Sequence, residues 1–493
     1  MSDDVDGAAP YDLGDLHERA QGSRIVVIGA GAGGLVAARE IAKLDIGVTV
    51  VDAASRPGGA IRSAEVAGIP LDLGAESFAT RGGHVAKLVD ELGLADRVVD
   101  PGTGAGGAWV AGVPGIGAAP LPAGGVLGIP GNPFADDVRR VIGWRGAWRA
   151  YLDRVRPVLT IGHAHSLGAL VRSRMGSRVL DRLVAPVTTG VYSASAEDID
   201  PDIAAPGLNQ ALTRAGSLSG AVLSLAEKRK AAPGGAVRGL RGGMATLTDA
   251  LAAAVEEAGG EVRLGAPATR ILEDGDGWLV EIEGEDGPET IAADGVIVAT
   301  EERPARRLLA PHAEGLAEDP PVPGPSVTVI TLVVQSPELD AKPRGTGVLT
   351  VPGSHRAKAL THSTAKWQWV AEQMEPGVHA VRVSFGSAEE PPATDGLDDA
   401  AAASLALSEA SDLLGTPLAP EQLLGYRVER FDQSQPAATF GQAEATRQAR
   451  DAIRAVPRIG AVGAWLAGTG LAQVVPDAIA EADRVRRAVL FSE

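Results

Sequence analysis

The sequence of 493 residues contains no cysteine. A chain without thiols has no disulfide, no thiolate metal ligand, no thiol nucleophile and no cofactor linked through cysteine. The absence of disulfides fits a reducing compartment, so we expect a cytoplasmic protein.

His163 and His165 stand two residues apart, without matched acids nearby, which is the wrong spacing for one face of a helix. No metal site is therefore expected.

Basic residues are also few in relation to acidic ones. Lysine and arginine number 45 against 63 aspartates and glutamates, which gives a net charge of −18. A nucleic-acid partner requires a basic protein face, and docking on anionic lipid requires one as well. We therefore expect neither kind of partner.

The sequence lacks segments typical of a membrane span or a secretion signal. Residues 1–20 are acidic and have no apolar core, which indicates a flexible tail rather than a signal peptide. Residues 101–135 carry no charge but are dense in glycine and proline, so their backbone could not satisfy its own hydrogen bonds in lipid. We expect packed loop and short strands there, and no transmembrane segment.

Glycine, by contrast, is abundant, and it is clustered near the start of the chain. The run from Arg24 to Ala53 has the pattern of a strand, a G-x-G-x-x-G turn, a helix, a second strand and a terminal acid. Gly29 allows a sharp turn, Gly31 lets backbone approach a diphosphate, and Gly34 lets the helix pack closely. Asp52 stands where a carboxylate binds a ribose. The unit predicts dinucleotide binding; a turn that serves packing alone is the alternative.

Two further glycine-rich segments bear on the identity of the cofactor. Gly58 and Gly59 come just after the ribose acid, a position that indicates cofactor contact rather than an ordinary turn. Near the other end, GTGLAQVVPDAI places a glycine-rich turn before a helix, whose N-terminus would stabilise negative charge on a reduced ring system. Two such helix ends suit a long cofactor, so they favour FAD over a nicotinamide.

The pattern of the whole chain predicts an α/β fold. We expect a Rossmann-like FAD-binding domain built from the discontinuous segments 21–98, 231–311 and 431–493, with residues 295–300 rejoining the first sheet. Residues 99–230 are predicted to be a mainly helical insertion. Residues 312–430 are predicted to be a substrate-binding domain with a mixed sheet. Its expected strands are residues 326–334, 347–351, 367–371, 379–385 and 424–430.

Several segments carry a resemblance to a known family. They are GAGAGG, RPGG, LGAESF, GLRGGMATL and GTGLAQVVPDAI. Together they resemble the FAD-dependent porphyrinogen oxidases, which belong to the flavin amine-oxidase superfamily, and the match covers nearly the whole chain. GIPLDLGAESFATR, GVYSASAEDID and THSTAKWQW are more specific to the porphyrinogen oxidases. They are most similar to the soluble bacterial branch that oxidises coproporphyrinogen III.

The resemblance implies an oxidoreductase of haem biosynthesis that acts on CH–CH donors. It would oxidise coproporphyrinogen III to coproporphyrin III by six electrons, with non-covalently bound FAD, with O2 as acceptor and with H2O2 as product. No side chain is assigned as catalytic, because the flavin N5 would accept the hydride. The implied partners are the tetrapyrrole substrate, O2 and a downstream enzyme of the haem pathway.

The resemblance also assigns cofactor contacts by position. The first glycine turn would contact the diphosphate, the acid after the second strand would hold the ribose, and the later segments would lie along the cofactor or close over its ring. The implied cofactor-binding residues are Gly29, Ala30, Gly31, Ala32, Gly33, Gly34, Asp52, Ala53, Arg56, Gly58, Gly59, Ser63, Gly74, Ala75, Glu76, Ser77, Ala268, Gly468, Gln473, Val474 and Val475.

Four residues are implied to bind the substrate: Arg81, Gly190, Ala194 and Trp367. Arg81 would pair with a propionate through a charge-assisted hydrogen bond, and Trp367 would pack on a pyrrole ring. The loop from Gly190 to Ala194 would face the macrocycle. Plainer interpretations are a surface arginine for Arg81 and a core residue of the second sheet for Trp367.

Other functions on the same fold remain open. A protoporphyrinogen IX oxidase is the first alternative, because the sequence does not show where basic residues meet around the propionates. A flavin amine oxidase commonly places two aromatic residues before the flavin, and this chain has only 4 Tyr, 6 Phe and 7 Trp. A carotenoid desaturase would need a more hydrophobic, membrane-binding surface. A scaffold that binds FAD without turnover is the alternative from another class.

Overall fold

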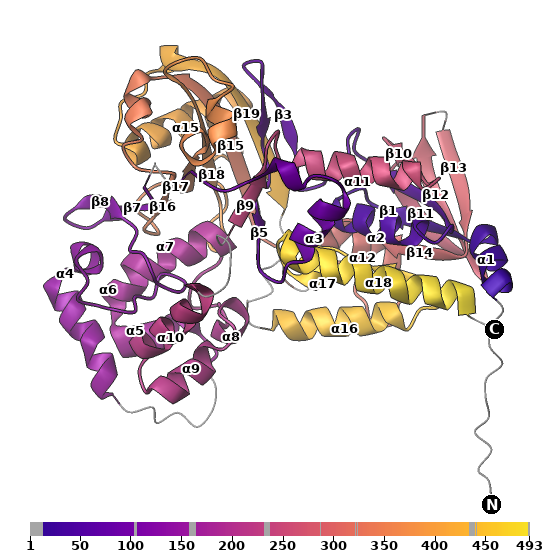
Figure 1. The fold of residues 1–493 in the computed structure, drawn as a ribbon, viewed down its shortest axis with the longest axis horizontal. Helices are drawn as coiled ribbons and strands as arrows, with labels where there is room; N and C mark the ends of the chain where they lie inside the picture. Colours follow the sequence, from indigo (N-terminus) through magenta and orange to yellow (C-terminus); the bar gives the residue numbers. More distant parts are fainter. Residues whose placement is uncertain are drawn as a thin grey trace, which may run out of the picture.

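The computed structural model of the protein describes residues 13–102, 106–156, 164–230, 237–285, 287–320, 322, 324–432, 439 and 441–491. Figure 1 shows three regions: one on a five-stranded sheet at the right, one on a seven-stranded sheet at the upper left, and a helical one at the lower left. The two ends of the described chain meet at the far edge of the first region, where the Arg19 guanidinium donates to the Leu490 carbonyl.

The first region is organised by a parallel sheet with the strand order β10-β2-β1-β14-β20. Its strands are β1 (Arg24–Ile28), β2 (Gly47–Asp52), β10 (Glu261–Leu264), β14 (Gly295–Val298) and β20 (Ile459–Ala461). Ile25 of β1 is in register with Gly295 of β14, and Val296 is in register with Ile459 of β20. Distant parts of the sequence thus supply adjacent strands, and the prediction that a strand within residues 295–300 rejoins the first sheet is confirmed.

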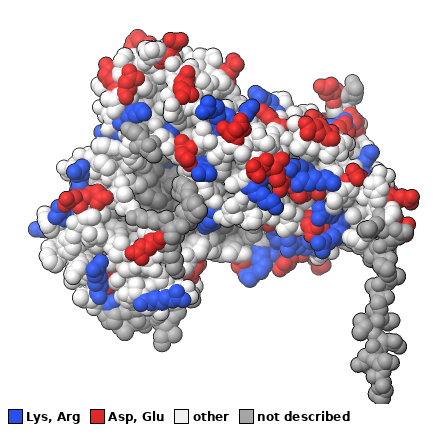
Figure 2. Space-filling view, in the orientation of Figure 1, with Lys and Arg blue, Asp and Glu red and all other residues white. Residues whose placement is uncertain are grey.

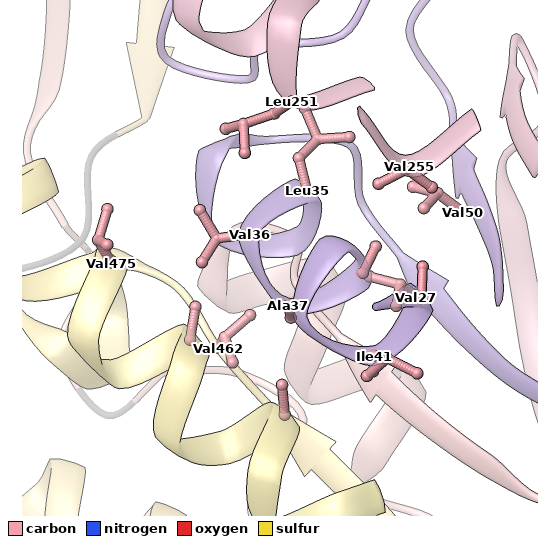
Figure 3. Close-up of a cluster of buried hydrophobic side chains, with 14 of the residues drawn as sticks. Val27, Leu35, Val36, Ala37, Ile41, Val50, Leu251, Val255, Val462 and Val475 are labelled. Carbon is pink, nitrogen blue, oxygen red and sulfur yellow. The ribbon is translucent and has the colours of Figure 1, made fainter. Parts of the chain in front are cut away.

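One face of this sheet is covered by helices. The helices are α2 (Ala32–Ala42), α3 (His84–Glu91), α11 (Ala245–Glu257) and α18 (Leu471–Phe491). Helix α2 lies at the centre and contacts both α11 and α18. Figure 3 shows its side chains in one aliphatic cluster with those of the neighbouring elements, namely Val27, Leu35, Val36, Ala37, Ile41, Val50, Leu251, Val255, Val462 and Val475. Each large side chain buried in this way contributes about 1.5–3 kcal/mol.

The other face of the sheet carries an antiparallel meander and three helices. These elements are β11 (Ala268–Asp274), β12 (Gly277–Gly284), β13 (Gly287–Ala293), α12 (Glu302–Leu309), α16 (Gln442–Arg454) and α17 (Ala464–Ala467). Val26 and Val298 of the sheet pack there against Ile271 and Val280 of the meander. The parallel sheet is therefore buried on both faces, as parallel sheets generally are.

The second region is a mixed sheet with the strand order β19-β15-β18-β17-β16-β7-β8. Its strands are β7 (Trp109–Val113), β8 (Gly117–Pro120), β15 (Ser326–Gln335), β16 (Gly347–Thr350), β17 (Ala357–His362), β18 (Val378–Phe385) and β19 (Leu423–Asp432). Strands β16 and β7 pair in parallel, whereas the other pairs are antiparallel. Helix α15 (Asp399–Leu414) packs on the sheet through Ala403, Ala406 and Leu407.

The third region is helical and follows β8 in the chain. Its elements are α4 (Asp136–Tyr151), η3 (Leu152–Val155), α5 (Leu167–Met175), α6 (Ser177–Val179), η4 (Leu180–Val184), α7 (Ala185–Val187), η5 (Thr188–Tyr192), α8 (Pro201–Ala204), α9 (Leu208–Ala215) and α10 (Leu218–Lys230). Val141, Leu167, Leu183 and Leu208 form the centre of its core. The same core includes Val110 of β7, so the helical region is anchored to the seven-stranded sheet.

Short elements connect the three regions. They are α1 (Leu13–Gly22), β3 (Ser63–Val66), β4 (Ile69–Asp72), β5 (Phe78–Ala79), η1 (Ala95–Arg97), β6 (Val98–Val99), β9 (Val237–Leu240), η6 (Pro337–Ala341), α13 (Ser363–Lys366), α14 (Gln368–Ala371) and η7 (Pro420–Gln422). Strands β3 and β4 pair as an antiparallel hairpin, and β5 and β6 flank β9. On the face drawn in Figure 2, acidic and basic side chains intermingle over the first region, and acidic ones gather at the tip of the second.

One predicted strand is wrong. Residues 367–371 were expected to be extended, but α14 covers Gln368–Ala371, and the missing strand is β17. The pattern is misleading because Trp367 and Trp369 alternate as in a strand while both are buried, at 2% and 8% exposed. Trp367 is an extended joint between two single helical turns, and both rings pack in the cluster that contains Leu71 of β4. Two apolar residues that are two positions apart and both buried therefore give the same sequence pattern as one face of a strand.

Four other segments differ from what the sequence led us to expect. Helix α1 begins inside the segment that we expected to be a flexible tail, and β7 and β8 of the expected helical insertion belong to the seven-stranded sheet. Helix α16 was not anticipated, and the expected loop at Gly190 begins in the helical turn η5. His163 lies outside the described residues; within them, no group of potential metal ligands occurs. None of the described helices is both long and apolar enough for a membrane crossing.

Candidate functional site

The turn between β1 and α2 accepts only glycine at two positions. Gly29 has φ +117°, and a Cβ on it would lie 2.7 Å from the Ala299 oxygen. A Cβ on Gly34 would lie 1.9 Å from the Gly29 oxygen, much closer than van der Waals contact allows. Any side chain at either position would therefore push β1 and α2 apart and displace the turn.

This turn presents unpaired donors at the N-terminus of α2. The first backbone hydrogen bond of the helix runs from the Leu35 N–H to the Gly31 carbonyl, so the N–H groups of the preceding residues have no acceptor within the helix. Such donors and the positive end of the helix dipole favour an anion, and a diphosphate fits them. Asp52 accepts from the N–H of Ala30 at 2.6 Å and of Ala54 at 2.7 Å, which orients its carboxylate beside the turn.

The second glycine pair lies directly against the first turn. The Gly58 N–H donates to the Ala30 carbonyl at 2.9 Å, and Gly31 and Gly58 form a parallel bridge. Gly58 has φ +131°, and a Cβ on Gly59 would lie 3.3 Å from the Gly31 Cα. The two predicted glycine motifs are therefore one structure, with backbone against backbone.

The C-terminal segment reaches the same place. A Cβ on Gly33 would lie 3.1 Å from Val474 Cγ1, and Val475 is completely buried in the cluster around α2 (Figure 3). Gly468, with φ +94°, ends the short helix α17, and the Gln473 N–H donates to the Gly470 carbonyl at 3.1 Å. The N-terminal glycine turn and the start of α18, two segments from opposite parts of the sequence, thus meet at the first turn of α2.

Residues 74–77 are tied to the same structure by the backbone. A Cβ on Gly74 would lie 2.0 Å from the Ala60 oxygen, and the Ala75 N–H donates to that oxygen at 3.1 Å. Ala53 and Arg56 are exposed, and Ser63 begins β3. Ala268 begins β11, two residues after Ala266, whose N–H donates to the Asp52 carbonyl at 2.8 Å. These positions therefore follow one path from the β2 end towards residue 74.

Glu76 is the centre of a buried charge cluster that the sequence did not reveal. Its carboxylate contacts Lys366 Nζ at 2.5 Å and Arg382 Nη1 at 3.0 Å, and its side chain is 11% exposed. Burial opposes ionisation of Glu76, but the two cations outweigh it and hold the pKa of Glu76 below its usual value. Arg382 also donates to the carbonyls of Leu73 and Gly74. The cluster therefore fastens residues 73–76 to the seven-stranded sheet.

Asp72 lies next to this cluster and has an unusual protonation behaviour. Burial raises its pKa to about 7, although Arg382 and the N–H of Met244 favour the ionised form. The Met244 N–H contacts both carboxyl oxygens, at 2.9 and 3.1 Å, so Asp72 also holds the start of α11. Asp72, Glu76 and Arg382 border a small cavity that also touches Trp367. A titratable carboxyl thus lies at the junction of all these elements.

The four residues implied to bind substrate are placed unevenly. Trp367 is in the core, with Lys366 Nζ 5.1 Å from its ring centre. Arg81 is exposed in a turn and forms no ion pair with any of the described side chains. Gly190 packs on β16, since a Cβ there would lie 2.5 Å from Leu349 Cδ2, and Ala194 is buried. Trp367 therefore lies beside the Glu76 cluster, whereas Gly190 lies against the seven-stranded sheet.

Sequence reasoning did not identify Asp72 and Arg382, and a weak signal existed for both. An acid in the apolar run Gly68–Phe78 needs a buried partner, and Arg382 is the only arginine or lysine of β18. Nothing local, however, indicates which cation reaches which acid, because Glu76 and Arg382 are 306 residues apart.

Comparison with known proteins agrees with this geometry. Residues 32–490 match the model of the flavin-containing amine oxidoreductase family. The coproporphyrinogen III oxidase of Mycobacterium tuberculosis is 31% identical over 94% of this chain and 96% of its own, and that of Bacillus subtilis is 26% identical over 92% and 95%. The solved structure of a protein from Exiguobacterium sp. 255-15 has the same fold, with a TM-score of 0.78 at 23% identity over 95% of this chain and 99% of that one.

The family match extends over nearly all the elements described above, from α2 to α18. The fold is that of flavoenzymes such as reduced UDP-galactopyranose mutase, which aligns with a TM-score of 0.66 at 16% identity over 95% of this chain and 94% of that one. The chain therefore belongs to the flavin-containing amine oxidoreductase family, among the porphyrinogen oxidases, and has a flavin as its cofactor.

Proposed function

We propose that the protein oxidises coproporphyrinogen III to coproporphyrin III in haem biosynthesis, with non-covalently bound FAD and O2 as the acceptor. The observation that carries the proposal is the contact of the C-terminal segment with the N-terminal glycine turn, where Val474 approaches the position of a Gly33 Cβ to 3.1 Å. A cofactor with a diphosphate at that turn can have its ring near the C-terminal segment. The proposed substrate is taken from the relatives. They are named coproporphyrinogen III oxidase, and they align with this chain over almost their whole length.

We assign the cofactor contacts to the chain as follows. The free N–H groups of the first turn of α2 would hold the diphosphate, and Asp52 would hold the ribose beside it. Gly468 and Gln473 would lie along the ring. FAD, when bound, supplies the two-electron acceptance for which the chain has no group of its own. The chain's own part is to bind, orient and enclose the reactants.

The overall reaction balances without a catalytic side chain. Coproporphyrinogen III loses six hydrogens, and three O2 become three H2O2. Arg81, exposed in its turn, is the proposed partner of a propionate, and the turn at Gly190 is the proposed wall facing the macrocycle. We further propose a cytoplasmic location and delivery of the product to a downstream enzyme of the haem pathway.

A direct test compares coproporphyrinogen III with protoporphyrinogen IX. We expect purified protein to be yellow, to release H2O2 and to form fluorescent porphyrin faster from coproporphyrinogen III. Faster turnover of protoporphyrinogen IX would replace the proposed substrate. Peroxide formation from polyamines alone would make the protein an amine oxidase, and a flavin that no porphyrinogen reduces anaerobically would indicate a scaffold.

Two matched glycine variants test the cofactor site. Gly34→Ala fits a helical backbone, but its Cβ would collide with the Gly29 oxygen at 1.9 Å, so we expect loss of flavin absorbance. Gly22→Ala introduces the same group where no atom lies within 4 Å, so this variant is expected to keep its flavin. Retention of full flavin content by Gly34→Ala would contradict the assignment of the diphosphate to this turn.

A further inference from the structure

A cavity of about 600 Å³ lies at one end of the seven-stranded sheet, between the β16–β17 segment, the segment after β18 and α15. Thr189 of η5, Lys358 of β17 and Glu409 of α15 are among its lining residues, together with the segment 386–393. Its size is in the range of small-molecule sites. None of the functional residues implied by the sequence lines it, although Thr189 precedes Gly190 directly.

The backbone around Lys358 is irregular in a way that redirects its side chain. The pairing of β17 with β18 shifts between Ala357 and Ala359, so Lys358 occupies a β-bulge. The buried Thr350 hydroxyl holds this bulge by donating to the carbonyl of Ala357 at 2.9 Å or of Lys358 at 3.0 Å. Bulges of this kind re-aim a side chain and are frequent next to functional sites.

The partner of Lys358 is strained as well. Lys358 Nζ donates to Ser193 Oγ at 2.6 Å, and Ser193 has φ +55°, a left-handed conformation that is uncommon for serine. Ser193 directly follows the π-helical turn η5, and its carbonyl accepts from the Ala388 N–H at 2.8 Å. A π turn, a strained serine and a bulge thus converge on one ammonium group. Irregularities of this kind cluster at ligand sites.

Lys358 is a buried cation that pairs with no carboxylate among the described residues. Its side chain is 8% exposed, and burial is the cause that lowers its pKa from 10.5 to about 8, so it stays mostly protonated at neutral pH. Its one hydrogen bond among the described residues, to a neutral hydroxyl, leaves two of three donors. A buried charge that is not paired is costly, and an anionic ligand would compensate it.

The acids of the cavity belong to other walls. Glu389 and Glu390 lie in the segment after β18, and Glu409 and Asp412 lie on α15. The Glu409 carboxylate accepts from the Ala357 N–H at 3.0 Å and is thereby fixed. A ligand with carboxylates at its rim and N–H donors in its ring satisfies both kinds of wall. A porphyrinogen with propionate groups has this chemistry, because its non-planar ring can turn pyrrole N–H groups outwards.

We propose that Lys358 is a carboxylate receptor that binds a propionate of the tetrapyrrole in the 600 Å³ cavity, with Ser193 holding its ammonium group in place. The proposal rests on the proposed function, because it takes its ligand from it. It adds a second cationic contact, distinct from Arg81, and so favours substrates that carry carboxylates on more than one side.

The test measures binding of coproporphyrin III by fluorescence and turnover of coproporphyrinogen III by porphyrin formation. Lys358→Met keeps the length of the side chain and removes the charge, Lys358→Arg keeps the charge, and Lys87→Met changes a lysine whose side chain is 78% exposed on α3. Loss of one charge-assisted hydrogen bond weakens binding by about tenfold or more. We expect Lys358→Met to raise both the dissociation constant and KM by that factor, with kcat little changed.

The controls separate this proposal from the function on which it rests. Lys358→Arg should bind more tightly than Lys358→Met, Lys87→Met should match the wild type, and coproporphyrin tetramethyl ester should bind equally to all. Because Lys358→Met removes a buried charge, it should not lower the unfolding temperature. An unchanged unfolding temperature excludes misfolding as the cause of weaker binding. Equal affinity of wild type and Lys358→Met for coproporphyrin III would overturn the proposal while the activity stands. A wild type that binds the porphyrin but oxidises neither porphyrinogen would overturn the proposed function instead.

Discussion

Replacing Arg382 by methionine tests whether the buried charge cluster holds residues 73–76 in place. Arg382 donates to Glu76 and to the carbonyls of Leu73 and Gly74, and its side chain is 11% exposed. Methionine fills a similar volume and provides no donor. Breaking a buried ion pair from one side costs about 3–5 kcal/mol. Because Lys366 still contacts Glu76, we expect the lower end of this range, about 3 kcal/mol.

The measurement is the unfolding temperature, with Arg270→Met as the matched control. Arg270 pairs with Glu281 at 3.6 Å across the meander, but its side chain is 64% exposed, so its loss should cost less than about 1 kcal/mol. At about 2.1 cal/mol/K of unfolding entropy per residue, each kcal/mol shifts the unfolding temperature of a 493-residue chain by about 1 °C, so Arg382→Met should melt about 3 °C lower. A double variant with Glu76→Gln should lose less than the sum of the single changes.

Two further readouts distinguish this cluster from an ordinary core contact. Arg382 lowers the pKa of Asp72, so its removal should raise that pKa beyond about 7. Residues 74–77 are proposed to line the cofactor, so the variant should also release FAD more readily. If Arg382→Met melted within a degree of the wild type, as the control should, the cluster would not hold this segment and the reasoning would be refuted.

Two other substitutions test the titration of buried acids. Asp72 has a pKa of about 7 in the folded chain against its usual 3.8, so the stability that its protonated form contributes at low pH is lost as pH rises from about 4 to 7. At about 1.4 kcal/mol per pKa unit this loss is about 4 kcal/mol. Asp72→Asn should therefore flatten the pH dependence of the free energy of unfolding between these pH values. Glu481 is 1% exposed, and despite its burial Arg484 and Arg454 hold its pKa below 4.5. Glu481→Gln should therefore destabilise the protein at neutral pH and not at acid pH, and equal destabilisation at both would contradict the assignment.

The elements that could be predicted are those whose cause is local. The turn requires glycine for local reasons, because Gly29 has φ +117° and a Cβ on Gly34 would collide with the Gly29 oxygen in the same turn. The helix after it and the acid at Asp52 follow within one βαβ unit. The parallel strand β14 was predicted for the same reason, because a short β-branched run between turns has few other uses.

The elements that were missed depend on contacts between distant segments. Trp367 and Trp369 have the spacing of a strand, but the β3–β4 hairpin buries both rings from the other side, and only the assembled structure reveals that second surface. Glu76 has its partners on helix α13 and strand β18, each about 300 residues away, so no window of the sequence contains either pair.

The location of these missed groups has a physical reason that links them. Local patterns encode backbone conformation, and the backbone suffices to bind a diphosphate that is common to many enzymes. Discrimination between substrates depends on side chains from the second sheet and the helical region, such as Lys358 at its bulge and Ser193 in its strained conformation. Such positions break the regular period of their elements, and a period-based reading passes over them for that reason. In this chain, therefore, a local glycine motif predicts the cofactor. The irregular backbone positions that would select the substrate leave no such local motif in the sequence.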